Sequence, residues 1–138
     1  MAHVQEMTKL FFEDGIPGFP HLQFFQLQQQ EANSPFFLLT SIEDPNVEFG
    51  VIDPFSFFPD YEFTLNEQVK ESLKITEEAA IAVLNIVTLR SDGEVTVNLK
   101  APLVMNMENR MAKQVILTEE NYQVRQPLFH LRSKAASE

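Results

Sequence analysis

Asp53 and Asp60 are the residues whose type and spacing come closest to a catalytic pair. They flank the aromatic part of VIDPFSFFPDY, residues 51–61, and an apolar environment can convert one carboxyl group of such a pair into a general acid. Two carboxylates with different roles are what hydrolysis of a glycosidic bond requires. Asp53, however, precedes Pro54 and Asp60 follows Pro59, and aspartate beside proline commonly organises a turn. The structural interpretation is therefore favoured, and no catalytic step is expected of either residue.

Other reactive groups are sparse. The three histidines, His3, His21 and His130, are far apart and share no metal-ligand spacing on one element. There is no cysteine, which excludes disulfides and thiolate chemistry. No nucleophile-elbow, phosphate-loop or dinucleotide motif is present. The sequence therefore predicts no enzyme activity, no metal and no cofactor.

Charge is the clearest pattern. The net charge is -10, and no lysine or arginine occurs between Lys9 and Lys70. Such a surface repels phosphate backbones, so direct nucleic-acid binding is not expected, whereas a basic protein partner would be attracted. Many acidic proteins carry such charge only for solubility, and composition alone favours that interpretation. The acidic residues singled out as a possible contact are Glu43, Asp44 and Glu48.

Length and composition set the class of protein. A chain of 138 residues, 44% of them hydrophobic, suits one domain with a buried core. The first residues lack a basic head followed by an apolar run, so no signal peptide is expected. The longest apolar stretch, AAIAVLNIVTL, is too short to span a bilayer. We expect a soluble cytoplasmic protein without a membrane partner.

The elements that must position these residues are mostly strands. Beta-type runs are LFF at 10–12, FFQLQ at 24–28, PFFLLTSI at 35–42 and VEFGVID at 47–53. The segment 80–100 predicts a hairpin that turns at Asp92-Gly93, with Gly93 at positive φ. Short strands LVMNM and QVILT follow at 103–107 and 114–118.

One helix is predicted over residues 64–73, where Thr64 and Glu67 match a capping box, and a further turn could follow Thr76. Strands with one interposed helix indicate a mainly β, small single-domain β-barrel-like fold with one or two short helices. We expect this domain to cover residues 1–130 and to leave a flexible tail at 131–138.

The aromatic segment 51–61 is expected to cross the domain as a loop, because prolines interrupt it. Some of its rings must fill the end of the barrel, since a fully exposed run would favour aggregation. Phe55 and Phe58 are expected to be mostly buried, and Phe57 and Tyr61 to reach the surface. Asn98 is expected on the polar face of its strand, bonded to backbone or water.

Three segments together resemble a known family. GIPGF at 15–19, SIEDPNVEFGVIDPFSFFPDY at 41–61 and TVNLKAPLVMN at 96–106 match, in order and spacing, the bacterial flagellar assembly factor family FliW. The match extends from about Leu10 to Phe129.

The resemblance implies a small β-barrel-type domain that binds two proteins and catalyses nothing. One partner is flagellin, held before export. The other is CsrA, a basic RNA-binding repressor of flagellin translation, which the family member binds and antagonises when it is free of flagellin. The residues that could contact these partners are Glu43, Asp44, Glu48, Asp53, Phe57, Asp60, Tyr61 and Asn98. Two alternatives stay open: a ligand-binding or hydrolytic barrel that uses a carboxylate pair, and a general export chaperone.

Overall fold

The strands and helices come from a computed structural model that describes residues 7–119 and 121–131. The strands, in chain order, are β1 (Met7–Phe12), β2 (Phe24–Gln29), β3 (Phe36–Ser41), β4 (Glu48–Ile52), β5 (Ile81–Leu89), β6 (Glu94–Val97), β7 (Leu103–Asn106), β8 (Met111–Gln114) and β9 (Gln126–His130). The helices are the α-helix α1 (Glu67–Ser72) and two 3₁₀ turns, η1 (Pro54–Ser56) and η2 (Glu78–Ala80). None of the described helices is long and apolar enough to cross a bilayer.

A closed barrel forms the centre of the fold. Its strands follow the order β4-β3-β2-β1-β8-β7-β5, and β4 pairs with β5 to complete the ring. That closing pair is short and consists of Val51 opposite Ile86 and Ile52 opposite Asn85. All neighbours are antiparallel except β1 and β8. This confirms the prediction of a mainly β, barrel-like fold with short helices.

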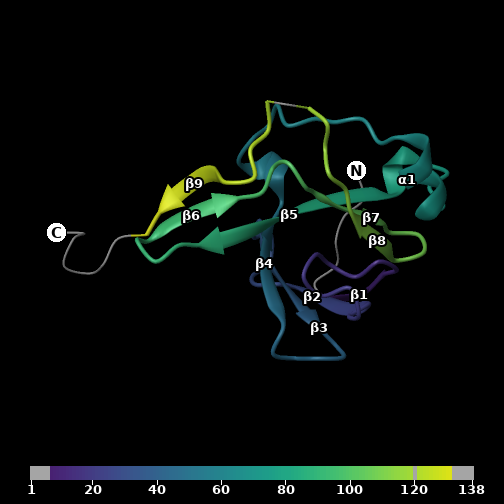
Figure 1. Ribbon diagram of the computed structural model, residues 1–138, viewed down its shortest axis with the longest axis horizontal. Helices are drawn as coiled ribbons and strands as arrows, with labels where there is room; N and C mark the ends of the chain where they lie inside the picture. The colour runs from purple at the N-terminus through teal and green to yellow at the C-terminus, as the bar shows by residue number, and fades with distance from the viewer. Residues whose placement is uncertain (1–6, 120, 132–138) are drawn as a thin grey trace.

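Beyond the barrel, β5 continues into a three-stranded arm. Residues 87–89 of β5 pair with β6, and β6 pairs with β9 on its other side. Figure 1 shows β5, β6 and β9 extending together away from β1, β2 and β3. Gly93 lies in the turn between β5 and β6 at φ 90°, as predicted. The strand β9 was not predicted from the sequence, because most of its residues are exposed and none is fully buried.

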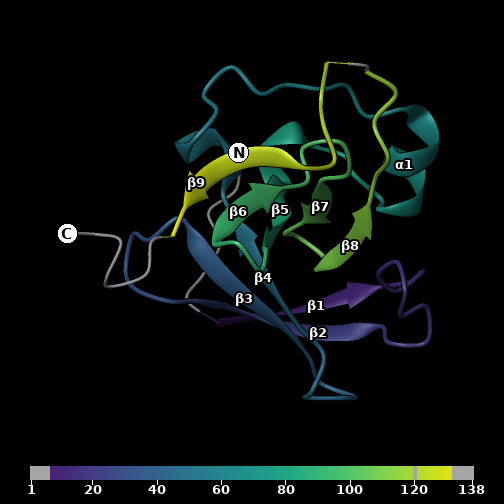
Figure 2. The ribbon, with the colours of Figure 1, turned by 60° about the vertical axis from the view of Figure 1, so that its left-hand side comes forward.

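Two separate apolar cores lie on the two faces of β5. Ala82 and Leu84 point into the barrel and pack with residues of β1, β2 and β3. Val83 points outward and packs in a second core with Leu65, Val69 and Leu73. Figure 2 shows the chain between β4 and β5 running above the β5–β7 wall, on the side away from β1 and β2. The protein is therefore a barrel with one additional layer over part of its outer wall.

The aromatic segment after β4 builds that outer layer. Its rings belong to the second core, so the prediction that they fill the end of the barrel is wrong. Phe55, Phe57 and Phe58 are all partly buried. Tyr61 is only 4% exposed, so the prediction that it reaches the surface is also wrong. Its ring has three aromatic neighbours: Phe55, Phe63 and Tyr122.

Two local boundaries differ from the predictions. The α1 cap is Asn66 rather than Thr64, since the Asn66 side chain accepts from the Val69 amide at 2.8 Å. The last barrel strand is β8 at 111–114 rather than a strand at 114–118. Pairing with β7 determines where β8 begins, because Asn106 at the end of β7 pairs with Met111 across a tight connection. Of the tail expected at 131–138, only Leu131 belongs to the described residues.

Candidate functional site

The acidic residues Glu43, Asp44 and Glu48 lie in and beside the connection between β3 and β4. The Glu43 Oε1 atom accepts from the backbone amides of Gln23 and Phe24, at 2.7 and 2.8 Å. The Phe24 amide first and the Gln23 amide second hold the pKa of Glu43 below its usual value. Glu43 therefore holds the β3–β4 connection against the start of β2. If Glu43 also contacts a partner, it does so in addition to this structural role.

The other two members of this group are also partly engaged. The Asp44 side chain accepts from the Asn46 amide at 3.2 Å, as expected of aspartate in a turn. Glu48 accepts from the Thr40 hydroxyl on the neighbouring strand at 3.0 Å. Glu43 and Glu48 are exposed and Asp44 is half-buried. Together the three carboxylates give this edge of the barrel a negative charge.

Asp53 and Asp60 differ in their hydrogen bonding. Asp53 caps η1: its Oδ1 accepts from the Phe55 amide and its Oδ2 from the Ser56 hydroxyl, both at 3.1 Å. Asp60 is exposed and makes no side-chain hydrogen bond within the described residues. Asp53 thus performs the turn function that its position before proline predicts. Nor do the described histidines and carboxylates gather into a set that could hold a metal ion.

Tyr61 and Asn98 join a buried polar network on the outer face of β5. The Tyr61 hydroxyl donates to the Leu99 carbonyl at 2.7 Å, and Asn85 donates from Nδ2 to the Asn98 carbonyl at 2.8 Å. Asn85 is fully buried and also lies 3.3 Å from the Tyr61 hydroxyl. Burial raises the pKa of Tyr61 to about 12. The network fixes the aromatic segment to the barrel wall.

Asn98 itself shapes the bend between β6 and β7. Its Oδ1 accepts from the amides of Lys100 and Ala101, at 3.1 and 3.0 Å. This confirms the prediction that Asn98 bonds to backbone. The prediction that it lies on the polar face of a strand is wrong, because β6 ends at Val97.

The predicted contact residues therefore fall into two groups. Glu48 begins β4 and Asp53 follows its last residue, so they lie at opposite ends of one strand. At about 3.3 Å per residue the separation is roughly 16 Å. The first group is the acidic edge (Glu43, Asp44 and Glu48), and the second belongs to the outer aromatic layer. The structure does not bring the two together into one site.

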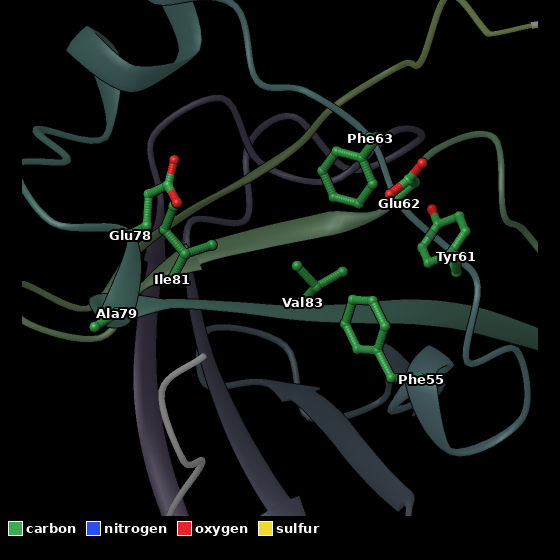
Figure 3. Close-up of a pocket in the computed structure, with 8 residues that line it drawn as sticks. All are labelled: Phe55, Tyr61, Glu62, Phe63, Glu78, Ala79, Ile81 and Val83. Atoms are coloured by element: carbon green, nitrogen blue, oxygen red, sulfur yellow. The ribbon is translucent and has the colours of Figure 1, made fainter.

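A groove in the outer layer was not predicted from the sequence. It encloses about 400 Å³, and its lining is Phe55, Tyr61, Glu62, Phe63, Glu78, Ala79, Ile81 and Val83. In Figure 3, Ile81 and Val83 lie on the β5 side, with the rings of Phe55, Tyr61 and Phe63 beside them. We call this the aromatic groove.

Two carboxylates border the aromatic groove. Figure 3 shows Glu78 at one end and Glu62 at the other, with the apolar side chains between them. The backbone at Glu62 is held by Tyr122, whose hydroxyl donates to the Glu62 carbonyl at 2.8 Å. Both side chains are exposed, and neither forms an ion pair with a described lysine or arginine. The arrangement suits binding of an apolar group that carries positive charge beside it.

The aromatic groove was not predicted from the sequence, because its residues are distant along the chain. Its lining comes from the aromatic segment and the two residues after it, from η2 and from β5, and only the fold brings these together. One feature of the sequence could have indicated it. Ile81 and Val83 are apolar although they lie on the face of β5 that points away from the barrel, so that face needs a covering layer.

Comparison with known proteins places the chain in a family. The sequence model described as FliW protein matches residues 1–128. The flagellar assembly factor FliW of Clostridium tetani is 39% identical over 131 residues, which cover 94% of this chain and 90% of that protein. The flagellar assembly factor FliW of Clostridium kluyveri is 44% identical over 130 residues, with the same coverage.

A solved structure supports the same assignment. A crystal structure of the flagellar assembly factor FliW superposes with a TM-score of 0.80 at 42% sequence identity, and covers 94% of this chain and 89% of that one. The three segments that carried the resemblance lie within the 1–128 match, and the fold agrees over nearly the whole chain. The chain belongs to the FliW family.

Proposed function

We propose that this protein is a flagellar assembly factor that binds flagellin and, when free of flagellin, binds and antagonises the translational repressor CsrA. Synthesis of flagellin would then follow its export, because unexported flagellin occupies the factor and leaves the repressor active. The observation that carries the proposal is family membership: relatives named flagellar assembly factor match over nine-tenths of the chain at about 40% identity. The proposed setting is the cytoplasm, where both partners are made.

The charge of the chain supports a basic partner. The acidic edge carries three carboxylates, and no lysine or arginine occurs between Lys9 and Lys70. A repressor that binds RNA through basic residues would be steered toward such a surface, and an RNA backbone would be repelled. We therefore place the repressor contact at the acidic edge and propose no direct contact with nucleic acid or membrane.

The test of this placement must respect the structural role of Glu43. Reversing its charge would break two backbone hydrogen bonds, so a weakened complex would not show that Glu43 contacts the repressor. Asp44→Asn with Glu48→Gln removes two charges and keeps side-chain shape. Glu13→Gln with Glu31→Gln is the matched control, since both are exposed glutamates outside the acidic edge.

Association with CsrA is measured by stopped flow at low and high salt. We expect the edge variant to associate more slowly than the control, with little change in dissociation, because rim charges act mainly on encounter. Salt should reduce the difference, since the screening length is about 8 Å at physiological ionic strength. Equal association rates for the edge and control variants would show that the repressor does not bind at the acidic edge.

The alternative of a hydrolytic barrel has less support. Both carboxylate oxygens of Asp53 are engaged with Phe55 and Ser56 in the η1 cap, so they have a structural role already. The relatives are named as assembly factors rather than as enzymes. We accordingly propose a non-enzymatic protein without a cofactor; turnover of a substrate that disappears in both Asp53→Asn and Asp60→Asn would contradict this. A general export chaperone would bind unrelated export substrates as tightly as flagellin.

A further inference from the structure

We infer that the aromatic groove is a docking site for a protein segment that presents a large apolar side chain between basic residues. The inference deepens the proposed function and rests on it, since it describes how one of the two protein partners would be held. The acidic edge lies at the far end of β4 from the aromatic segment, so the groove is a second contact surface.

The shape and lining of the groove fit an apolar anchor. A volume of about 400 Å³ is near the lower end of the range for pockets that enclose small ligands. Phe55 and Tyr61 have ring centroids 5.9 Å apart, and Tyr61 and Phe63 5.5 Å, so three neighbouring rings form one wall. Along β5, the two-residue step from Ile81 to Val83 spans roughly 7 Å. That length accommodates one or two large side chains.

The rim chemistry specifies positive charge beside the anchor. Glu62 and Glu78 stand at opposite ends of the apolar floor (Figure 3). The ion pairs among the described residues, Lys70 with Glu67 and Lys113 with Asp14, involve neither of them. A lysine or arginine on each side of the anchor would therefore find a carboxylate without displacing an existing partner.

The composition of the chain argues against other occupants. A second copy carries a net charge of -10 as well, so two acidic surfaces would have to meet. Residues 1–6 contain no lysine or arginine, and residues 132–138 contain no large apolar side chain. Leu131, the large apolar residue before Arg132 and Lys134, is already held in the arm, because its amide donates to the Gly93 carbonyl at 2.7 Å. Anionic ligands are disfavoured by the same two glutamates.

The test uses amphipathic helical peptides as probes. One peptide combines leucine with lysine, a second leucine with glutamate, and a third alanine with lysine. Binding is measured by titration into the isotopically labelled protein, where amide shifts report the location. We expect the leucine–lysine peptide alone to bind and to shift the amides of Phe63, Ala79 and Ile81.

Two pairs of variants separate the groove from general acidity. Glu62→Gln with Glu78→Gln should weaken the leucine–lysine peptide about fivefold, since each rim charge contributes modestly, while Glu13→Gln with Glu31→Gln should not. Ala79→Lys places a cation at the groove and should weaken binding, whereas Ala32→Lys adds the same charge at another exposed alanine. Circular dichroism and melting temperature check that each variant folds.

The inference is overturned if the leucine–lysine peptide does not bind, or if the alanine–lysine peptide binds equally well. It is also overturned if the amide shifts lie outside the aromatic groove, or if the groove and control variants lose the same amount of affinity for the leucine–lysine peptide. Parallel titrations with flagellin and CsrA separate this failure from failure of the proposed function. Should wild type bind both proteins and the groove variants bind them unchanged, only the groove assignment falls. Should wild type bind neither protein, the proposed function falls, whatever the peptide does.

Discussion

The carboxylate side chains of this protein have different roles, and the hydrogen bonds that each one makes determine its role. Glu43 fastens two strands through backbone amides, and Asp53 caps a turn. Glu62 and Glu78 border an apolar groove and form no ion pair with the lysines and arginines of residues 7–119 and 121–131. The last pair has no structural side-chain hydrogen bond to keep among the described residues, whereas the exposed carboxylates of the acidic edge would meet a partner while also holding the β3–β4 connection. A list of acidic residues therefore says little about binding until each hydrogen bond is known.

Glu43 should make the stability of the protein depend on acid pH. The pKa of Glu43 is lowered in the folded state. Its contribution to the free energy of unfolding is therefore present above the unfolded-state pKa and is lost as pH falls through the folded-state pKa. We expect Glu43→Gln to be less stable than wild type near neutral pH, and the difference to shrink as pH falls below 4.5, the ordinary pKa of glutamate. Urea unfolding across this range measures it. Glu31→Gln is the control, and an unchanged gap in acid would refute the role of the charge.

Tyr61 should contribute through its hydroxyl as well as its ring. Tyr61→Phe keeps the packing but removes the donor to the Leu99 carbonyl, which should cost about 1–3 kcal/mol. Because burial raises the folded pKa to about 12 from 10.0, the stability of wild type should also fall as pH rises through that interval. Denaturant unfolding at neutral and alkaline pH tests both effects. Equal stability of the two proteins at neutral pH would show that the hydrogen bond contributes nothing.

Some residue roles could be predicted from sequence because they depend only on near neighbours. The turn role of Asp53, the backbone bonding of Asn98 and the positive φ of Gly93 are of this kind. The burial of Tyr61 is not, since it depends on Leu99 and Asn85, which are distant in sequence. The same reason hid the aromatic groove.

At the scale of elements, the hairpin turn at Gly93 controls whether β9 can join the arm. Gly93 has φ 90°, and a Cβ atom there would collide with the Leu131 carbonyl oxygen. The Leu131 amide also donates to the Gly93 carbonyl at 2.7 Å. A side chain at this position would therefore push the end of β9 away from β6.

Gly93→Ala should destabilise the arm by about 1–3 kcal/mol and speed hydrogen exchange of the β9 amides. Gly18→Ala is a close control, because Gly18 has φ 89° but no atom within 4 Å of the added Cβ. It should carry the backbone strain without the collision. Equal exchange of β9 in both variants would show that the collision does not matter.

The elements with a strong local pattern were predictable, and those set by pairing were not. Alternation located β4, and the Asp-Gly turn located the β5–β6 hairpin. The short β8 was placed too late, because its register depends on β7 and β1 rather than on its own residues. An edge strand such as β9, with mostly exposed residues, leaves no apolar pattern to detect.

At the scale of the whole molecule, stability depends on two cores that share β5. Val97 belongs to the second core and is 0% exposed. Val97→Asp would bury an unpaired charge at a cost of several kcal/mol, and we expect it to unfold the domain. Thr88→Asp, at an exposed position on the adjacent strand, should melt near wild type. A Val97→Asp protein with a normal melting temperature would mean that the second core is dispensable.

We propose that this one protein binds flagellin and the repressor in alternation. The most direct measurement is competition: the chain is bound to labelled CsrA, purified flagellin is added, and release of CsrA is followed by fluorescence anisotropy. We expect the chain to bind CsrA in the absence of flagellin, and added flagellin to release CsrA in proportion to the flagellin complex that forms. Failure of the chain to bind either partner, or formation of a complex in which flagellin leaves CsrA fully bound, would contradict it.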